Sequence, residues 1–376
     1  MKLYESLALQ TEELKSLGNL RCFPTTSNTS LQLSSNDYMG ISKEKSLMTE
    51  FQEACLENKW EMGACSSRLL TGNHEAYNEL EALLADLYAK GASLVFNSGY
   101  HANMGILPAL TTSKDLIVAD QFVHASMIDG IRLSNASFWR FRHQNYNQLE
   151  TYLEKHRDNY ENVFIVVESL YSMDGDFADL SRLVDIKKRF DCCLYVDEAH
   201  AFGVVGHKGL GLCEKENVIS DIDFIVGTFG KAIASQGAFV ACDPIIKSWL
   251  IQKSRTLIYT TALPEASVRW SCFVIQFLVD SHKRREELEE VSRWFSHQLG
   301  GTGSSPIVPY IVGSNHQALA LSKFLEERNI SVLPIRYPTV PKGTARLRFS
   351  LTVGVTKDQL QEVIDGIECF QKNQGV

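Results

Sequence analysis

Six short apolar runs in the middle of the chain constrain its fold most strongly. They cover residues 94–96, 116–119, 163–167, 194–196, 224–226 and 238–241. These runs favour β-branched residues and are continuous rather than alternating, which is typical of strands covered on both faces. Amphipathic helical patterns separate several of them. In the clearest, within residues 80–88, the leucines share one face, and Gly91 is expected to end the helix. The alternation predicts an α/β fold with a mainly parallel sheet.

The C-terminal third of the chain has a different pattern. A charged helix is expected near residues 283–295, followed by a Gly/Ser-rich break at 300–305 and an alternating strand at 345–351. The period of two in that strand puts Arg346 and Arg348 on one face and apolar residues on the other. We therefore expect a smaller α+β domain at the C-terminus.

The change of pattern suggests three parts. We expect an N-terminal segment over residues 1–45, a major domain over 46–270 and the C-terminal domain over 271–376. A chain of 376 residues is long enough to bury a sizeable core in the major domain.

Composition narrows the compartment and the partners. The 37 basic and 45 acidic residues give a net charge of −8, which argues against a general affinity for nucleic acid or anionic membranes. No apolar stretch approaches transmembrane length, and the first twenty residues contain no continuous apolar region typical of a signal peptide. The nine cysteines form no C-x-x-C pair, which fits a reducing compartment. A cytoplasmic protein is expected.

One lysine carries the strongest chemical signal. Lys231 lies among small residues in the run 227–232, where it can be desolvated and held near an aldehyde, as Schiff-base formation requires. Asp197 ends an apolar run and could pair with the protonated pyridine nitrogen of pyridoxal phosphate (PLP). Each signal is weak alone, because Gly-Lys turns are common and Asp-Glu-Ala-His also occurs in ATPases. Together they indicate a PLP enzyme.

Further polar residues follow the expected strands, where ligands bind in open α/β sheets. The amides of residues 97–101 could cradle a phosphate, with Gly99 allowing close approach, although an ordinary strand-to-helix turn explains this segment better when it is taken alone. His124 could stack on a pyridine ring, but a lone histidine is more often structural. His200 could hydrogen-bond either the nearby aspartate or a ring oxygen, and Ser172 could line the same opening.

Three rival sites lack essential parts. An ATPase needs a G-x-x-x-x-G-K-[ST] loop, and a hydrolase of the nucleophile-elbow type needs G-x-S-x-G, but the chain contains neither. A zinc site that used His200 and His207 would need a third ligand at a recognisable spacing, and the sequence offers no credible one. Bound metal is therefore not expected, and PLP remains.

The order of the polar motifs resembles that of the α-oxoamine synthases, PLP-dependent enzymes of fold type I. The resemblance runs nearly end to end, through residues 33–40, 98–103, 172–176, 196–200, 228–231 and 259–264. It implies a PLP-binding major domain with a seven-stranded, mainly parallel sheet flanked by helices, and a homodimer as the active unit. Residues 338–348 favour the branch that condenses L-alanine with a pimeloyl thioester, carried by CoA or an acyl carrier protein, to give 8-amino-7-oxononanoate for biotin biosynthesis.

The resemblance also implies residue roles around the cofactor ring. Lys231 would form the Schiff base with PLP and later move the Cα proton. Asp197 would pair with the pyridinium nitrogen, His124 would stack on the ring, and His200 would hydrogen-bond its phenolic oxygen.

The remaining roles implied by the resemblance concern the phosphate and the substrates. The amides of Gly99 and Tyr100, with Thr228 and the nearby Ser172, would hold the phosphate, and Thr261 would reach the phosphate of the neighbouring subunit. Substrate-binding residues would be Arg348 and Asn36 for the amino-acid carboxylate, and Thr339 and Arg21 for the acyl substrate.

Alternatives stay open. Ala64 and Cys65 replace glycines of a loop that is usually glycine-rich in the family, so the conformation of that loop is not predicted. The same scaffold could instead condense glycine with acetyl-CoA to give 2-amino-3-oxobutyrate. A catalytically silent partner subunit is a third reading, against which the retention of Lys231, Asp197 and His200 argues.

Overall fold

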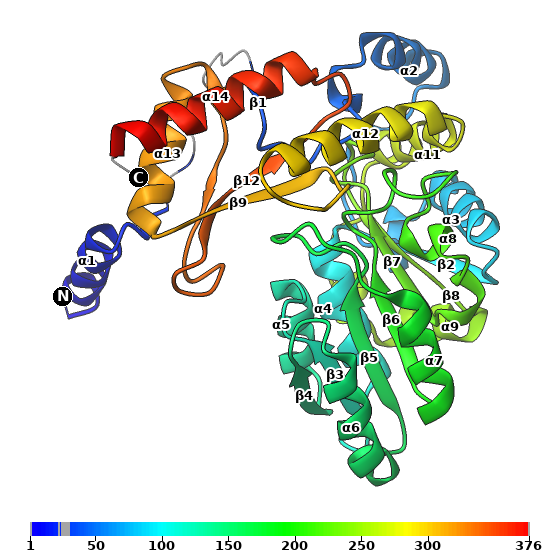
Figure 1. Cartoon of the computed structure of the whole chain (residues 1–376). Coiled ribbons are helices and arrows are strands. Elements are labelled where there is room, and N and C mark those ends of the chain that lie inside the picture. Colours follow the sequence, from blue (N-terminus) through cyan, green and yellow to red (C-terminus); the bar gives the residue numbers. More distant parts are fainter. Residues whose placement is uncertain (1, 22, 24–30, 375–376) are drawn as a thin grey trace. The chain divides into compact units, whose positions relative to one another are not determined.

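The computed structural model describes residues 2–21, 23 and 31–374, which form two compact units (Figure 1). Unit 1 comprises the described residues of Met1–Tyr38, Met173–Gly175 and Glu286–Val376, and unit 2 comprises Met39–Ser172 and Asp176–Arg285. The three-part division expected from the sequence, with boundaries after residues 45 and 270, stays a prediction.

Unit 2 is built around a seven-stranded sheet with the order β2-β8-β7-β6-β5-β3-β4. Every neighbouring pair is parallel except the two pairs made by β8. The strands are β2 (Ala92–Phe96), β3 (Leu116–Asp120), β4 (Ser137–Phe141), β5 (Val163–Glu168), β6 (Cys193–Asp197), β7 (Phe224–Thr228) and β8 (Ala238–Cys242). The predicted fold class is confirmed, and each of the six apolar runs lies within a strand.

Strand β4 is the one strand of this sheet that the apolar runs did not predict. It lies at the edge of the sheet, and among its five residues only Phe141 is buried. An edge strand needs no continuous apolar run because solvent reaches part of it, so the pattern used for the other strands does not reveal it.

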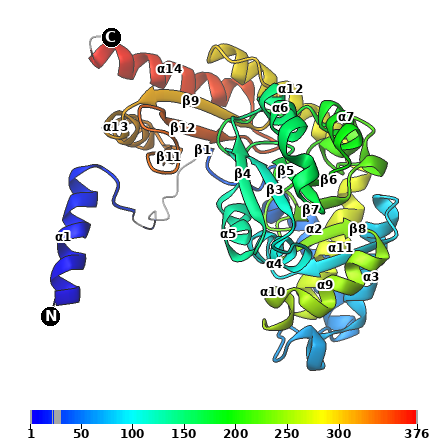
Figure 2. The ribbon, with the colours of Figure 1, turned by 90° about the horizontal axis from the view of Figure 1, so that it is seen from below.

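Helices cover both faces of the sheet. One face packs against α4, α5 and α9 through a buried core that includes Ile106, Met127 and Leu250. Figure 2 shows α6 and α7 on the opposite face. The α-helices of unit 2 are α2 (Lys45–Asn58), α3 (Glu75–Leu87), α4 (Gly99–Leu110), α5 (Ala125–Leu133), α6 (Tyr146–His156), α7 (Leu180–Phe190), α8 (Leu212–Lys215), α9 (Pro244–Lys253), α10 (Arg255–Ile258) and α11 (Glu265–Val279). Short helical turns are η1 (Ile41–Lys43), η2 (Arg68–Gly72), η3 (Arg157–Asn159) and η4 (Ile219–Asp221).

The role expected of Gly91 as the stop of helix α3 is wrong. The helix ends at Leu87, and Ala89 takes the left-handed conformation with a φ of 46°. A Cβ atom on Gly91 would lie 2.6 Å from Cδ of Pro244, the first residue of α9. A close approach to α9, rather than a helix cap, therefore requires glycine at this position.

Unit 1 contains the smaller α+β domain. A three-stranded antiparallel sheet has the order β11-β12-β9, made of β11 (Pro334–Ile335), β12 (Ala345–Ser350) and β9 (Ile307–Gly313). A short parallel pair joins β1 (Leu31–Gln32) to β10 (Ile330–Ser331). The helices are α1 (Lys2–Ser16), α13 (Asn315–Glu326) and α14 (Lys357–Gln374), and α12 (His282–Gln298) runs across the boundary between the units.

Strand β12 keeps the predicted alternation, but both of its faces are covered. Leu347 and Phe349 are fully buried, and Arg346 and Arg348 are nearly so. Buried guanidinium groups require partners, so this arginine face is a candidate for a built polar site. Among the residues that the structure describes, no helix is both long enough and apolar enough to cross a membrane.

Candidate active site

Polar residues end three adjacent parallel strands of unit 2. Glu168 is the last residue of β5, Asp197 of β6 and Thr228 of β7, and Glu168 and Asp197 are paired across the strands. The buried His200 lies in the turn after β6, and Lys231 lies in the bend between β7 and β8. Because these strands run in the same direction, their polar ends meet at one edge of the sheet, which is where ligands bind in such folds.

Asp197 is held in a defined orientation. Its Oδ1 accepts a hydrogen bond from the Ala199 amide at 2.8 Å, and its Oδ2 accepts one from Nδ2 of Asn103 at 2.8 Å. The residue is 4% exposed, so these donors replace water around most of the carboxylate.

Glu168 is a buried carboxyl group whose pKa is raised to about 8. Burial disfavours its charged form, and the negative charge of Asp197 adds to the effect, whereas the positive charge of Lys231 opposes it. Its Oε2 accepts a hydrogen bond from the Ser172 amide at 3.1 Å. Glu168 therefore interacts with three residues that the sequence assigned to the site: it hydrogen-bonds Ser172 and feels the charges of Asp197 and Lys231.

Lys231 is held by a folded backbone segment. Phe229 N–H donates to Gly237 O at 2.9 Å and closes the loop, and Ala234 N–H donates to Lys231 O at 2.9 Å. The Lys231 charge acts on the pKa of both Glu168 and His124, so the lysine shares their edge of the sheet.

His124 forms the N-cap of helix α5. Its Nδ1 accepts a hydrogen bond from the Ser126 amide at 3.2 Å and lies 2.7 Å from the Ser126 hydroxyl. Burial lowers the pKa of His124, the nearby Asp197 carboxylate opposes that effect, and the Lys231 cation lowers it further. The neutral imidazole is thus favoured.

The residues expected to cradle a phosphate lie at the start of helix α4. Gly99 is its first residue, and a Cβ placed there would lie 3.7 Å from Cβ of Thr228. The amides of Gly99 and Tyr100 at the helix start, the threonine hydroxyl and the space left by the glycine suit an anion. The Tyr100 side chain points away to a hydrogen bond with Asp129, which leaves its backbone amide as the relevant group. Thr261 is exposed, and its carbonyl accepts a hydrogen bond from Nδ2 of Asn97 at 2.6 Å.

Arg348 and Asn36 come together within unit 1. Nη1 of Arg348 donates to Oδ1 of Asn36 at 3.3 Å and to the Ser350 hydroxyl at 2.6 Å, and Nη2 donates to the Tyr38 hydroxyl at 3.2 Å. The neighbouring Arg346 instead pairs with Asp174 at 2.6 Å. The two arginines on one face of β12 therefore have different partners, and sequence reasoning missed Tyr38, Ser350 and Asp174.

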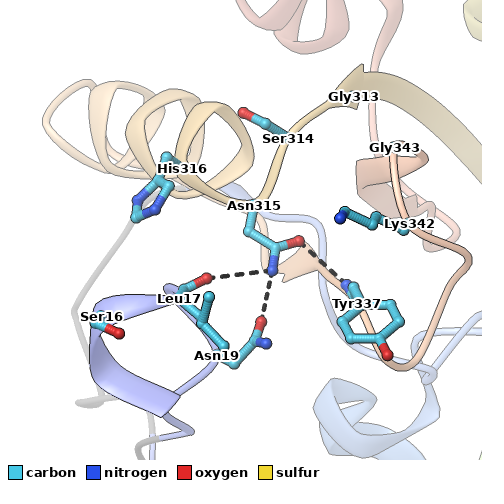
Figure 3. Close-up of a pocket in the computed structure, with 10 residues that line it drawn as sticks. All are labelled: Ser16, Leu17, Asn19, Gly313, Ser314, Asn315, His316, Tyr337, Lys342 and Gly343. Atoms are coloured by element: carbon cyan, nitrogen blue, oxygen red, sulfur yellow. Dashed lines mark hydrogen bonds between the residues drawn. The ribbon is translucent and has the colours of Figure 1, made fainter. Parts of the chain in front are cut away.

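The other predicted pair, Arg21 and Thr339, is also brought together, with Nη2 of Arg21 donating to Oγ1 of Thr339 at 3.3 Å. The loop that carries Thr339 borders a pocket of about 540 Å³ in unit 1 (Figure 3). Asn315 crosses its floor and hydrogen-bonds Asn19 at 2.5 Å and the Tyr337 amide at 3.1 Å. The lining residues are Ser16, Leu17, Asn19, Gly313, Ser314, Asn315, His316, Tyr337, Lys342 and Gly343.

Comparison with known proteins shows the family. The family model described as "Aminotransferase class I and II" matches residues 28–367. The chain belongs to this family. It is therefore an enzyme of the aminotransferase class I and II family, with a fold of type I, and the predicted resemblance is confirmed.

Two curated relatives are identical to this aminotransferase-family chain at about half of the aligned positions. Proteins from Neisseria meningitidis serogroup A and from Haemophilus influenzae are 48% and 50% identical over 338 residues, and each alignment covers 88% of this chain and 89% of the relative. Both are named "Putative 8-amino-7-oxononanoate synthase".

Solved structures of the family are similar over most of the chain. A serine palmitoyltransferase variant from S. paucimobilis, with bound PLP-myriocin aldimine, has a TM-score of 0.89 at 27% identity and covers 100% of this chain and 98% of its own. The 8-amino-7-oxononanoate synthase from Francisella tularensis has a TM-score of 0.78 at 29% identity, covering 92% and 99%.

Sequence reasoning missed three residues at the sheet edge of unit 2. Glu168, Asn103 and Ser126 contact predicted site residues but were not selected. A signal for Glu168 existed, because it ends the run 163–167 as Asp197 ends the run 194–196. Asn103 and Ser126 carried no comparable signal, since uncharged polar residues in helices are common.

Proposed function

We propose that this enzyme uses PLP to condense L-alanine with a pimeloyl thioester, releasing CO₂ and the thiol and giving 8-amino-7-oxononanoate in biotin biosynthesis. The observation that carries the proposal is the meeting of Lys231, Asp197 and His124 at the polar edge of the unit 2 sheet. The names of the relatives support the choice of product.

The residues at this edge fit PLP. An amide-rich helix start with a glycine, beside the Thr228 hydroxyl, suits the phosphate, and Ser172 lies in the adjacent strand-end loop. A buried aspartate with both oxygens hydrogen-bonded suits a pyridinium nitrogen, while the His124 and His200 imidazoles suit the ring and its phenolic oxygen. When bound, PLP supplies a ring that accepts the electron pair released at Cα and again when CO₂ leaves.

The chain's own residues then have separable tasks. Arg348 and Asn36 bind the amino-acid carboxylate, and the charged fork of Arg348 orients it. Lys231 Nζ removes the proton from Cα of the amino acid. Thr339 and Arg21 contact the acyl donor, whose carbonyl carbon forms the new bond to Cα while the thiol departs.

The same proposal includes a homodimer located in the cytoplasm. Support for the dimer comes from Thr261, which is exposed and so is accessible to a second copy of the chain. Either CoA or an acyl carrier protein would deliver the acyl group.

A product assay tests the reaction. Alanine, glycine and serine are each combined with pimeloyl and acetyl thioesters, and the amino ketone and CO₂ are quantified. We expect alanine with the pimeloyl thioester to give the fastest turnover. Glycine with acetyl-CoA as the best pair would establish the sister reaction instead, and a purified chain that takes up no PLP would favour a silent partner subunit.

Lys231→Ala tests the lysine assignment directly. The variant should lose turnover and the visible absorbance of lysine-linked PLP, because no other residue is assigned to attack the aldehyde. Borohydride reduction followed by peptide mass spectrometry should label Lys231 in the unmodified enzyme. Lys208→Ala, at an exposed lysine, is the matched control and should behave like wild type. Normal turnover by the Lys231→Ala variant would refute the assignment of Lys231 as the PLP-binding lysine.

A further inference from the structure

A buried chain of hydrogen bonds connects two of the proposed cofactor residues through Asn103. The Tyr195 hydroxyl donates to Oδ1 of Asn103 at 2.6 Å. Nδ2 of Asn103 donates to Oδ2 of Asp197 at 2.8 Å and to the Ser126 hydroxyl at 3.0 Å. The Ser126 hydroxyl in turn lies 2.7 Å from Nδ1 of His124. Asn103 and Ser126 are each 1% exposed, so water does not substitute for these partners.

The donors and acceptors that surround Asn103 determine the direction of each hydrogen bond that it makes. Burial and the nearby Asp197 charge raise the pKa of Tyr195 well above its ordinary value, so its hydroxyl keeps a proton to donate. The amide oxygen of Asn103 must therefore face Tyr195. The opposite amide orientation would place that oxygen against the Asp197 carboxylate and leave Tyr195 facing a donor.

The same assignment of donors and acceptors can be made for the His124 imidazole. Ser126 Oγ accepts from Nδ2 of Asn103, which leaves its own hydrogen available to Nδ1 of His124, 2.7 Å away. The Ser126 backbone N–H also points at Nδ1, at 3.2 Å. Two donors converge on that nitrogen, which therefore carries a lone pair rather than a proton.

We propose that Asn103 is a positioning residue that orients Asp197 and, through Ser126, holds His124 in its neutral form with the proton on Nε2. The inference rests on the proposed PLP function for its catalytic consequence. A neutral imidazole beside the ring leaves the pyridinium charge to be balanced by Asp197 alone. An imidazolium at the same place would repel that charge and weaken the pairing.

The charged groups around His124 come from four elements. Asp197 on β6 and Asp129 on α5 favour a charged imidazole, whereas Lys231 after β7 disfavours it. Glu168 on β5 has its pKa raised to about 8 and is largely neutral at pH 7. Burial is the largest influence and favours the neutral imidazole, and the hydrogen bonds at Nδ1 decide which of the two nitrogens carries no proton.

The first test measures His124 without PLP. The ¹⁵N chemical shifts of the imidazole nitrogens are followed against pH in the full chain, with His124→Gln used for assignment. Wild type should show an unprotonated Nδ1 near neutral pH. In Asn103→Leu, which keeps the size but removes the hydrogen bonds, the Ser126 hydroxyl loses the partner that fixes its orientation and can rotate to accept a hydrogen bond from a protonated Nδ1. The proton affinity of His124 should then rise by about tenfold, which is about one pH unit.

The second test measures the affinity for PLP. Asn103→Leu should weaken PLP binding by about tenfold or more, because Asp197 Oδ2 loses a charge-assisted donor. Ser126→Ala interrupts only the link to His124, so it should change the ¹⁵N shifts while leaving most of the PLP affinity intact. It also keeps the inference testable if Asn103→Leu fails to fold.

Asn162→Leu is the matched control. Asn162 also donates its amide to a buried carboxylate, Asp115, at 2.7 Å, but this pair lies at the opposite ends of β3 and β5 from the site. It should alter neither the His124 shifts nor PLP affinity. Unchanged ¹⁵N shifts and PLP affinity in a folded Asn103→Leu would overturn the inference. Absence of PLP binding by wild type would instead refute the proposed function, while the His124 measurement would still decide the role of Asn103.

Discussion

His143 offers the sharpest test of the electrostatics of unit 2. Its Nδ1 lies 3.0 Å from Oδ1 of Asp120, its Nε2 lies 2.8 Å from Oδ2 of Asp176, and its ring stacks on Phe122. Burial lowers the pKa of His143, but the hydrogen bonds to the two carboxylates outweigh it and raise the value to about 10. The histidine is therefore charged at neutral pH and ties the end of β3 to the segment that follows Ser172.

The pKa shift predicts how stability depends on pH. A histidine has a pKa of about 6.5 when unfolded, and each unit of difference corresponds to about 1.4 kcal/mol. Because the folded pKa is the higher one, the stabilisation is fully present below pH 6.5 and is lost as pH rises through 10. The upper bound on the loss over that window is roughly 5 kcal/mol.

Denaturant unfolding of wild type and His143→Gln at pH 6.5, 8 and 9.5 measures this effect. The difference in free energy of unfolding between the two proteins should shrink by several kcal/mol from the lowest pH to the highest. His297→Gln, which changes an exposed histidine, is the control and should alter the free energy of unfolding little. A His143→Gln difference that does not change with pH would refute the reasoning, because it would mean that folding does not raise the pKa of His143.

Two further substitutions test the polar edge and the arginine face. Glu168→Gln imitates the neutral carboxyl group. Because the folded pKa of Glu168 is raised to about 8, wild type should lose stability relative to the variant as pH rises from 4.5 through 8. Stability curves of the two proteins that stay parallel over this range would contradict the assigned protonation. Arg348→Lys removes the planar guanidinium group that donates to Asn36 and Tyr38. The KM for alanine should therefore rise about ten- to a hundredfold, with a smaller change in kcat. Arg293→Lys, at an exposed arginine, is the control and should change neither constant. An unchanged KM in the Arg348 variant would remove it from the carboxylate site.

Much of the unit 2 sheet was predictable because buried strands appear in the sequence as continuous apolar runs. A strand covered by helices on both faces must be apolar along most of its length, and the runs that became β2, β3, β5, β6, β7 and β8 met that requirement. The polar residues that interrupt such runs were predictable for the same reason. Asp197, at the last position of β6, was selected from its place after an apolar run together with the Lys231 segment.

The other parts of the site depend on neighbours that are distant in the sequence. The pKa of Glu168 follows from its burial and from the charges of Asp197 and Lys231, and no local pattern shows that those two charges lie close to it. Gly91 was assigned to a helix end because its real contact, Pro244, lies far along the chain.

By itself, the sequence determined six strands of the unit 2 sheet, the lysine and aspartate that indicate PLP chemistry, and the family. Only the tertiary structure decided the protonation of His143, because Asp120 and Asp176 reach it from separate elements. It likewise decided the orientation of Asn103, whose partners lie on β6 and α5. The physical reason is that burial imprints a periodic pattern on the residues of one element, whereas hydrogen bonds and charge interactions depend on distances between elements, which no local pattern records.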